Sequence, residues 1–266
     1  MSCILHRGTA PLVVSMPHTG TDIPEELRGD YVPRALAVED TDWHLPRLYD
    51  CLPALGASVL RPRHSRYVID LNRPPDDTPM YPGASNTELC PTHFFNGDPL
   101  YLHGHEPTMQ ERQRRRELYW DPYHRMLRDE LDRIKSVHGF VLLWDAHSIR
   151  SEIPWLFEGV LPDLNIGTAD GASADPGITQ AVVQAAGRYA DVSHVVNGRF
   201  KGGYITRNYG TPIEHVHAIQ LEMCQKLYMS ERPPFDYQDA LALRVQPVIQ
   251  DIVSAALAAC VALYGR

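Results

Sequence analysis

Two histidines and one carboxylate-rich segment have the residue types that a metal-dependent hydrolase needs. His18 comes shortly after the apolar run 11–16, and His147 comes shortly after the apolar run 139–143. A catalytic zinc site uses three protein ligands, drawn from imidazole and carboxylate groups, and leaves a fourth position for water. We therefore predict that His18 and His147 are metal ligands. Asp42 is our choice for the third ligand, and Asp40 and Glu39 are the alternatives in the same segment.

Each of these residues also has a purely structural interpretation. A single histidine at a strand end is more often held by hydrogen bonds than bound to a metal, and Asp42 could be a solvated charge on a helix. The sequence contains no compact metal motif such as HExxH. The combination of two strand-end histidines with a nearby carboxylate is what favours the metal site.

Glu222 is the candidate for proton transfer. It lies between Leu221 and Met223 in an apolar segment that alternates as a strand does, so its side chain faces the opposite side from theirs. A buried carboxylate needs a partner or a chemical role. Near a metal it could act as general base and then general acid. The alternative is an ordinary salt bridge with Arg207 or Lys201.

Arginines and a glycine-punctuated basic segment are the candidates for substrate binding. Arg66 and the pair Asn72-Arg73 flank one short apolar segment, and a guanidinium group can bind a carboxylate with two hydrogen bonds. Residues 199–207 could bring backbone amides and cations close to a small anion. The alternatives are surface charges and a hairpin turn. The predicted substrate-binding residues are Asn72, Arg73, Arg199, Lys201 and Arg207.

The segments that must position these groups alternate between strand and helix patterns. Ligands collect outside the carboxyl ends of strands in open α/β sheets, so both histidines are expected at one edge. The composition of residues 74–105 predicts a long irregular excursion, of the kind that can form a lid. We predict strands at 11–16, 57–60, 67–71, 139–143, 192–196 and 217–223, and helices at 34–52, 106–138 with a kink at Pro122, 178–189 and 237–263.

Composition limits the classes of function. The chain has 266 residues, 44% hydrophobic content and a formal net charge of −8, which disfavours general binding to nucleic acid or to an anionic membrane. No stretch is expected to span a membrane, and we expect no leader segment. The five scattered cysteines indicate reduced thiols in the cytoplasm. We predict one domain over residues 1–266, and the oligomeric state stays open.

The sequence resembles the N-formylglutamate amidohydrolase family along most of its length, and five motifs in combination make the resemblance specific. They are Ser15-Met16-Pro17-His18-Thr19-Gly20, Asp40-Thr41-Asp42-Trp43-His44, Ser65-Arg66-Tyr67-Val68-Ile69-Asp70-Leu71-Asn72-Arg73-Pro74, Leu143-Trp144-Asp145-Ala146-His147-Ser148-Ile149-Arg150-Ser151 and Asn197-Gly198-Arg199-Phe200-Lys201-Gly202-Gly203.

The resemblance implies a fold and an order of functional groups. The family is similar in fold to zinc carboxypeptidases and aspartoacylase, so we predict an α/β fold with a mixed, mostly parallel sheet flanked by helices. In that wider group one histidine and a carboxylate ligand come first, followed by arginine and an Asn-Arg pair for substrate, a second histidine ligand and a catalytic glutamate. The carboxypeptidase pattern places its carboxylate ligand three residues after the first histidine, where this sequence has Thr21. The order maps onto His18 and Asp42, then Arg66, Asn72 and Arg73, then His147 and finally Glu222.

The resemblance also implies an activity, which is zinc-dependent hydrolysis of N-formyl-L-glutamate to formate and L-glutamate in histidine degradation. Zinc-bound water would attack the formyl carbonyl, Glu222 would serve as general base and then acid, and Arg66 would help to stabilise the oxyanion. Other divalent transition metals suit the same ligands. One alternative is a deacylase of another N-acyl acidic amino acid, carrying an acetyl or carbamoyl group. The other is a non-catalytic, metal-stabilised protein that binds an acidic amino acid.

Overall fold

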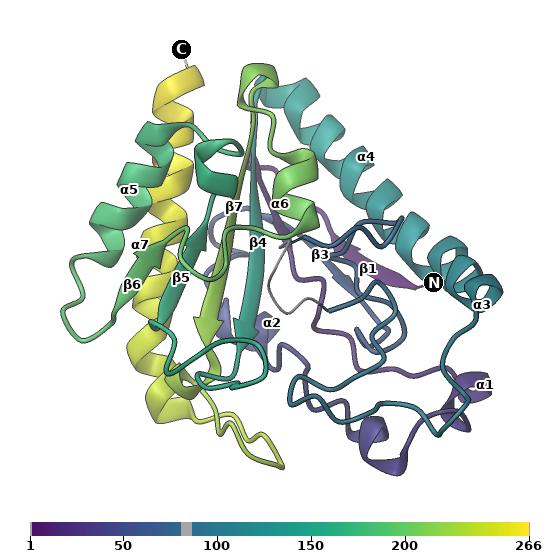
Figure 1. Cartoon of the computed structure of the whole chain (residues 1–266). Helices are drawn as coiled ribbons and strands as arrows, with labels where there is room; N and C mark the ends of the chain where they lie inside the picture. Colours follow the sequence, from purple (N-terminus) through teal and green to yellow (C-terminus); the bar gives the residue numbers. More distant parts are fainter. Residues whose placement is uncertain (1, 81–86, 266) are drawn as a thin grey trace.

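A seven-stranded sheet forms the centre of the computed structural model, which describes residues 2–80 and 87–265. Its order is β1-β3-β2-β4-β7-β5-β6 (Figure 1). The pairs β1–β3 and β5–β7 are antiparallel and the other four are parallel, which confirms the predicted mixed, mostly parallel sheet. The strands are β1 (Cys3–His6), β2 (Leu12–Ser15), β3 (Ser58–Pro62), β4 (Val141–Ile149), β5 (Leu164–Gly167), β6 (His194–Val196) and β7 (Val216–Cys224).

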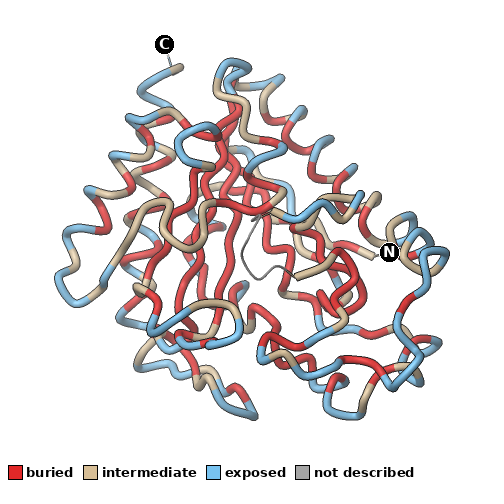
Figure 2. Tube along the Cα trace, in the orientation of Figure 1, coloured by how far each residue is buried: buried red, intermediate tan, exposed pale blue. Residues whose placement is uncertain are grey.

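Helices cover both faces of the sheet, and the alternation of side chains along β4 shows which face meets which helix. Leu142 and Trp144 point into a core shared with α2 (Leu45–Leu48), α5 (Pro176–Ala186) and α7 (Asp239–Tyr264). Val141 and Leu143 point into a second core, shared with α4 (Asp121–His138) and α6 (Tyr204–Tyr209). Figure 2 shows the central strands buried throughout. Asp145 and His147 follow the spacing of the second set, so they lie on the α4 and α6 face.

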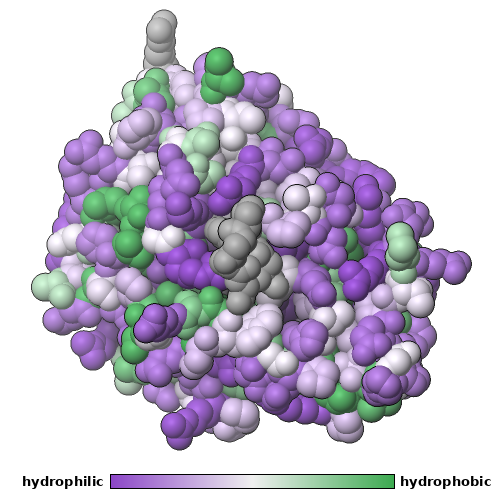
Figure 3. Space-filling view, in the orientation of Figure 1, coloured by the Kyte–Doolittle hydropathy of each residue, from purple (hydrophilic) through white to green (hydrophobic). Residues whose placement is uncertain are grey.

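Helix α7 is long and apolar enough to cross a membrane by length and composition alone, which the sequence patterns did not predict. Its apolarity has a structural cause. Val245, Ile249 and Ile252 are buried in the core that α7 forms with α5 and β4. The face of the molecule in Figure 3 is mainly hydrophilic, and its hydrophobic residues form separate patches.

The prediction of one helix over 34–52 is wrong. It contains a 3₁₀ helix at Pro33–Ala37 and the single turn of α2, and the residues between them are irregular. Val38 and His44 have φ of 45° and 62°, which interrupts the helical path at two places. Asp40 and Asp42, which lie between these two positions, hydrogen-bond to groups that are distant in sequence.

The predicted strand at 67–71 is also wrong. Tyr67 and Val68 pack in a separate cluster with Phe94 and Tyr101, away from the sheet. The backbone turns twice here, because the N–H of Val68 donates to the carbonyl of Ser65 and that of Arg73 to the carbonyl of Asp70.

Other boundaries differ in smaller ways. Strand β4 continues through residue 149 because it pairs with β7 along its whole length. The helix predicted over 106–138 is α3 (Met109–Arg115), a π-helical turn at Arg116–Trp120, and α4 with Pro122 in its first turn. Strands β1 and β5 lie in segments for which no strand was predicted. Residues 74–80 and 87–105 form no helix or named strand, and the rest of the predicted lid, 81–86, lies outside the described residues. The short elements are α1 (Glu25–Arg28) and 3₁₀ helices at Ala169–Gly171, Pro212–Glu214 and Gln225–Leu227.

Candidate metal centre

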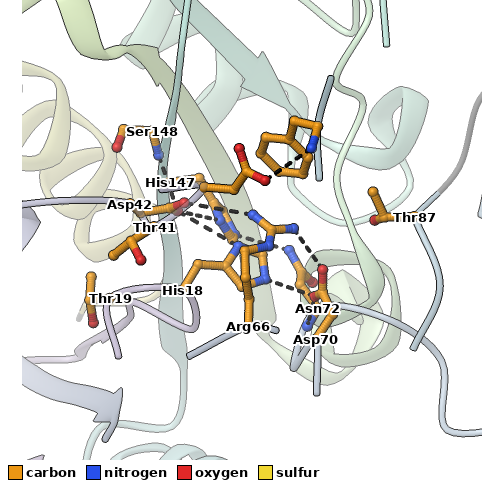
Figure 4. Close-up of polar contacts among 12 residues, drawn as sticks. His18, Thr19, Thr41, Asp42, Arg66, Asp70, Asn72, Thr87, His147 and Ser148 are labelled. Carbon is orange, nitrogen blue, oxygen red and sulfur yellow. Dashed lines mark hydrogen bonds and ion pairs between the residues drawn. The ribbon is translucent and has the colours of Figure 1, made fainter. Parts of the chain in front are cut away.

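Strands β2 and β4 bring the two histidines together, as predicted. The strands are adjacent and parallel, with Ser15 opposite Asp145. His18 follows the end of β2, His147 lies near the end of β4, and their ring centroids are 4.8 Å apart. Both side chains are buried. Figure 4 shows them converging on the same point from two segments that are far apart in sequence.

Asp42 is the carboxylate that joins these histidines. Its backbone N–H donates to the carbonyl of His18, and its Oδ2 accepts from the N–H of Ser148 at 3.2 Å. The same Oδ2 lies 3.1 Å from His147 Nδ1 and 3.7 Å from His18 Nδ1. Ligands of one tetrahedral zinc, with bonds of about 2.0–2.2 Å, must lie about 3.4 Å apart. His18, Asp42 and His147 therefore fit a metal ion.

The alternative carboxylates face elsewhere. Asp40 pairs with Arg150 at 2.7 Å and accepts hydrogen bonds from the hydroxyl of Tyr67 and the N–H of Phe95. Glu39 pairs with Arg34. Among Glu39, Asp40 and Asp42, only Asp42 belongs to the group of potential ligand atoms.

Two further aspartates, which sequence reasoning missed, bind the other nitrogen of each histidine ring. His18 Nε2 lies 2.7 Å from Asp70 Oδ1, and His147 Nε2 lies 3.0 Å from Asp145 Oδ2. If each Nε2 carries the proton and donates it to its aspartate, the lone pair of each Nδ1 faces Asp42. This arrangement of carboxylate, histidine and metal is typical of metal sites.

The balance of charge also favours a bound cation. Burial alone would raise the pKa of Asp42, but its contacts with His147 and His18 outweigh this effect and hold that pKa below its usual range. Burial likewise opposes the charged form of His147, yet Asp145 and Asp42 raise its pKa well above the usual value. The pKa of Asp70 is also held well below its usual value, because His18 and Arg66 outweigh the effect of burial. Several carboxylates thus remain ionised in one buried region, and they stabilise positive charge among them.

Glu222 lies beside this centre on the neighbouring strand. It is paired with His147 in the β4–β7 register, and its side chain is buried. Burial raises its pKa to about 8, an effect that His147 opposes and Asp42 reinforces. A carboxyl group whose pKa is close to neutrality can both accept and release a proton at physiological pH.

Arg66 spans the space between the metal centre and the cavity. Its Nη2 donates to Asp70 Oδ2 at 2.6 Å, its Nη1 lies 3.8 Å from Asp42 Oδ1, and its guanidinium stacks over the ring of Phe95. The cavity at this edge of the sheet has both charged and apolar walls. It is lined by His18, Arg66, Asn72, Arg73, Thr87, Phe95, His147, Ile149, Leu156, Arg199, Phe200, Gly203, Gln220 and Glu222.

The predicted substrate-binding residues divide into two groups. Asn72, Arg73 and Arg199 line the cavity. Arg73 is anchored by hydrogen bonds to Thr87, and Arg199 donates to the carbonyl of Leu156. Lys201 and Arg207 are absent from the cavity wall formed by the described residues. Lys201 pairs with Asp170, and Arg207 Nε donates to the carbonyl of Gly202.

Comparisons with known proteins agree with the sequence resemblance. A model of the N-formylglutamate amidohydrolase family matches residues 10–229. The chain is 50% identical to the N-formylglutamate deformylase of Pseudomonas putida over 253 residues, which cover 95% of this chain and 94% of that protein. It is 51% identical over 255 residues to the N-formylglutamate deformylase of Pseudomonas aeruginosa, with the same coverage. Its fold is similar to that of N-formylglutamate amidohydrolase from Ralstonia eutropha JMP134, with a TM-score of 0.80, 24% identity and 97% of both chains covered. The chain therefore belongs to the N-formylglutamate amidohydrolase family.

Proposed function

We propose that this protein hydrolyses N-formyl-L-glutamate to formate and L-glutamate in a metal-dependent reaction. The observation that carries the proposal is the convergence of His18, Asp42 and His147 at one edge of a cavity that also contains Glu222 and three arginines. The curated Pseudomonas relatives, each about half identical along nearly the whole chain, bear the name of this activity.

Zinc is the metal that we propose, because two imidazoles and one carboxylate are a common ligand set for catalytic zinc. When bound, zinc supplies Lewis acidity that polarises a carbonyl group and makes water more acidic. Asp70 and Asp145 support the choice, since each orients one of the two histidines through its Nε2 atom.

Glu222 is the proposed proton carrier. Its carboxylate takes a proton from the water that attacks the formyl carbon, and it then gives that proton to the glutamate nitrogen as the C–N bond breaks. One water is consumed, and formate and L-glutamate are released. Burial of Glu222 excludes bulk solvent, so the proton stays with the reacting groups.

The arginines have separate proposed roles. Arg66, held against Asp70 and Phe95, presents its guanidinium to the oxygen that gains negative charge during the attack. Arg73 and Arg199 line the cavity, and each can bind one of the two carboxylates of the substrate. Two anionic groups on the substrate thus meet two fixed cations.

We also propose that the reaction takes place in the cytoplasm as part of histidine breakdown. All five cysteines are free and buried, which suits a reducing compartment.

The test is formate release from N-formyl-L-glutamate by purified protein, measured before chelation, after chelation and after zinc is added back. We expect turnover that the chelator abolishes and zinc restores, with one metal per chain by elemental analysis. N-acetyl and N-carbamoyl glutamate, tested at the same concentration, should react much more slowly. A preference for either would overturn the proposed substrate, and binding without turnover by zinc-loaded protein would indicate a binding protein.

A further inference from the structure

The side-chain amide of Asn72 makes contacts that a direct substrate ligand would not need. Its Oδ1 accepts a hydrogen bond from the backbone N–H of Ile205 at 2.8 Å, in the first turn of α6. Its Nδ2 lies 3.2 Å from Asp145 Oδ2 and 2.9 Å from His147 Nε2. The Asn72 side chain therefore connects the start of α6 to one half of the metal centre.

We infer that Asn72 is a positioning residue, which holds Asp145 and through it the metal-binding His147. This inference rests on the metal site of the proposed function. It differs from the sequence-based prediction that Asn72 binds a carboxylate of the substrate. A positioning residue uses its amide hydrogens for Asp145, whereas a substrate ligand would use them for the substrate carboxylate.

The orientation of the amide is fixed by its partners. A backbone N–H can only donate, so the atom that faces Ile205 must be the oxygen, and the NH₂ group must face Asp145. When His147 uses Nδ1 for a metal, its Nε2 carries a proton. Asn72 Nδ2 and His147 Nε2 then both donate to the same oxygen of Asp145, which brings the two nitrogens close together.

Asp145 depends strongly on these two donors. Its carboxylate is fully buried, and no hydrogen-bond partner is found for its Oδ1 among the described residues. Its Oδ2 lies 3.0 Å from His147 Nε2, accepts a hydrogen bond from Asn72 Nδ2 at 3.2 Å, and accepts a weaker one from the hydroxyl of Thr206 at 3.5 Å. Loss of the Asn72 amide would leave a buried carboxylate with less support, and buried carboxylates are costly without partners. The position of His147 would then be less well defined.

A substrate carboxylate would compete for the same hydrogens. The Asn72 side chain is only 3% exposed, and both ends of its amide already face protein groups. Binding an anion through Nδ2 would weaken the bond to Asp145. The adjacent Arg73 is half-buried, lines the cavity and has a guanidinium suited to carboxylates, so it can bind the anion without this cost.

Gly203 provides a second way to disturb the amide. A Cβ atom at residue 203 would lie 2.4 Å from Asn72 Nδ2 and 2.6 Å from its Oδ1. Gly203 has φ of −83° and ψ of −164°, an extended conformation that alanine also adopts. The substitution Gly203→Ala therefore displaces the Asn72 amide while it leaves the chemical groups of Asp145 and His147 unchanged.

The experiment measures zinc affinity without substrate, by competition with a chromophoric chelator, for the wild type, Asn72→Ala and Gly203→Ala. Arg73→Met is the matched control in the cavity. We expect the zinc Kd to rise about 10- to 100-fold in Asn72→Ala and in Gly203→Ala, as for other partners of metal ligands. The visible spectrum of the cobalt-substituted protein should also change in both. Arg73→Met should keep the wild-type zinc Kd and show a raised KM. Circular dichroism checks that each variant is folded.

The two possible failures are distinguishable. A zinc Kd unchanged in both Asn72→Ala and Gly203→Ala, together with a raised KM in Asn72→Ala, would overturn the positioning role in favour of direct substrate binding. If the wild type binds zinc but does not release formate, the proposed substrate fails, and the comparison of zinc affinities still decides the role of Asn72. A wild type that binds no zinc refutes both.

Discussion

Replacement of Glu222 by glutamine is the most direct test of the proposed chemistry. Glutamine has nearly the same shape as glutamate, and Glu222 is packed in the β4–β7 ladder opposite His147, so Glu222→Gln should fold normally. It also leaves His18, Asp42 and His147 intact, so the protein should keep its metal. The change removes one function only, which is the capacity to take and return a proton.

The expected loss is large and falls on kcat. A positioned general acid or base contributes about 10²–10⁴ in rate, which corresponds to about 3–5 kcal/mol of activation free energy. The KM should stay about the same, because glutamine keeps nearly the same shape and the arginines that line the cavity are unchanged. Substrate binding to the inactive variant can therefore be measured directly by calorimetry.

The assay follows formate release at saturating substrate, with the metal content of each preparation measured in parallel. Glu222→Gln that retains more than a tenth of the wild-type kcat at full metal content would show that another group carries the proton. A loss of activity in proportion to a loss of metal would show that Glu222 helps to retain the ion instead. Either result would refute the role assigned here.

Other perturbations test separate parts of the site and the fold. Asp70→Asn removes the negative charge beside Nε2 of His18, one of the proposed metal ligands, so the zinc Kd should rise about 10- to 100-fold in a chelator competition, and an unchanged Kd would contradict this. Arg199→Met should raise KM about 10- to 100-fold with little change in kcat. Lys201→Met should change KM less than about twofold, because the ammonium group of Lys201 lies outside the cavity wall. Equal effects of the two substitutions on KM in steady-state kinetics would show that Arg199 and Lys201 do not differ in substrate binding. Burial lowers the pKa of His124 to about 3 from its ordinary 6.5, so the unfolded chain gains a proton first as pH falls below 6.5, and stability decreases. About 2 kcal/mol should be lost between pH 7 and pH 5 through this group, and urea unfolding of His124→Asn should show a smaller loss than the wild type.

The sequence was sufficient to predict the histidines because their placement follows from local rules. Two apolar runs each precede a histidine, and adjacent parallel strands bring such residues to one edge of a sheet. Asp145 could have been found in the same way. It lies two residues before His147 in a strand, so its side chain has to point to the same face.

The rest of the site depends on contacts that no local pattern contains. Asp70 lies in a turn that was interpreted as a strand, and its role comes from the distant His18. The irregular path between residues 38 and 44 requires left-handed conformations at Val38 and His44, and the β-branched side chain of Val38 strongly disfavours that conformation. Tertiary hydrogen bonds of Asp42 override helical spacing there, and that competition cannot be judged from the sequence of the segment alone.

The pairing of His147 with Glu222 across β4 and β7 has a consequence for how activity responds to local opening of the chain. Both residues belong to the two longest strands at the centre of the sheet, where all eighteen residues are buried. Backbone amides in such strands exchange with solvent only when the whole domain unfolds. The separation between His147, a proposed metal ligand, and Glu222, the proposed proton carrier, is therefore as persistent as the native state itself. Opening of the surrounding loops can change how fast substrate enters and products leave without changing this separation.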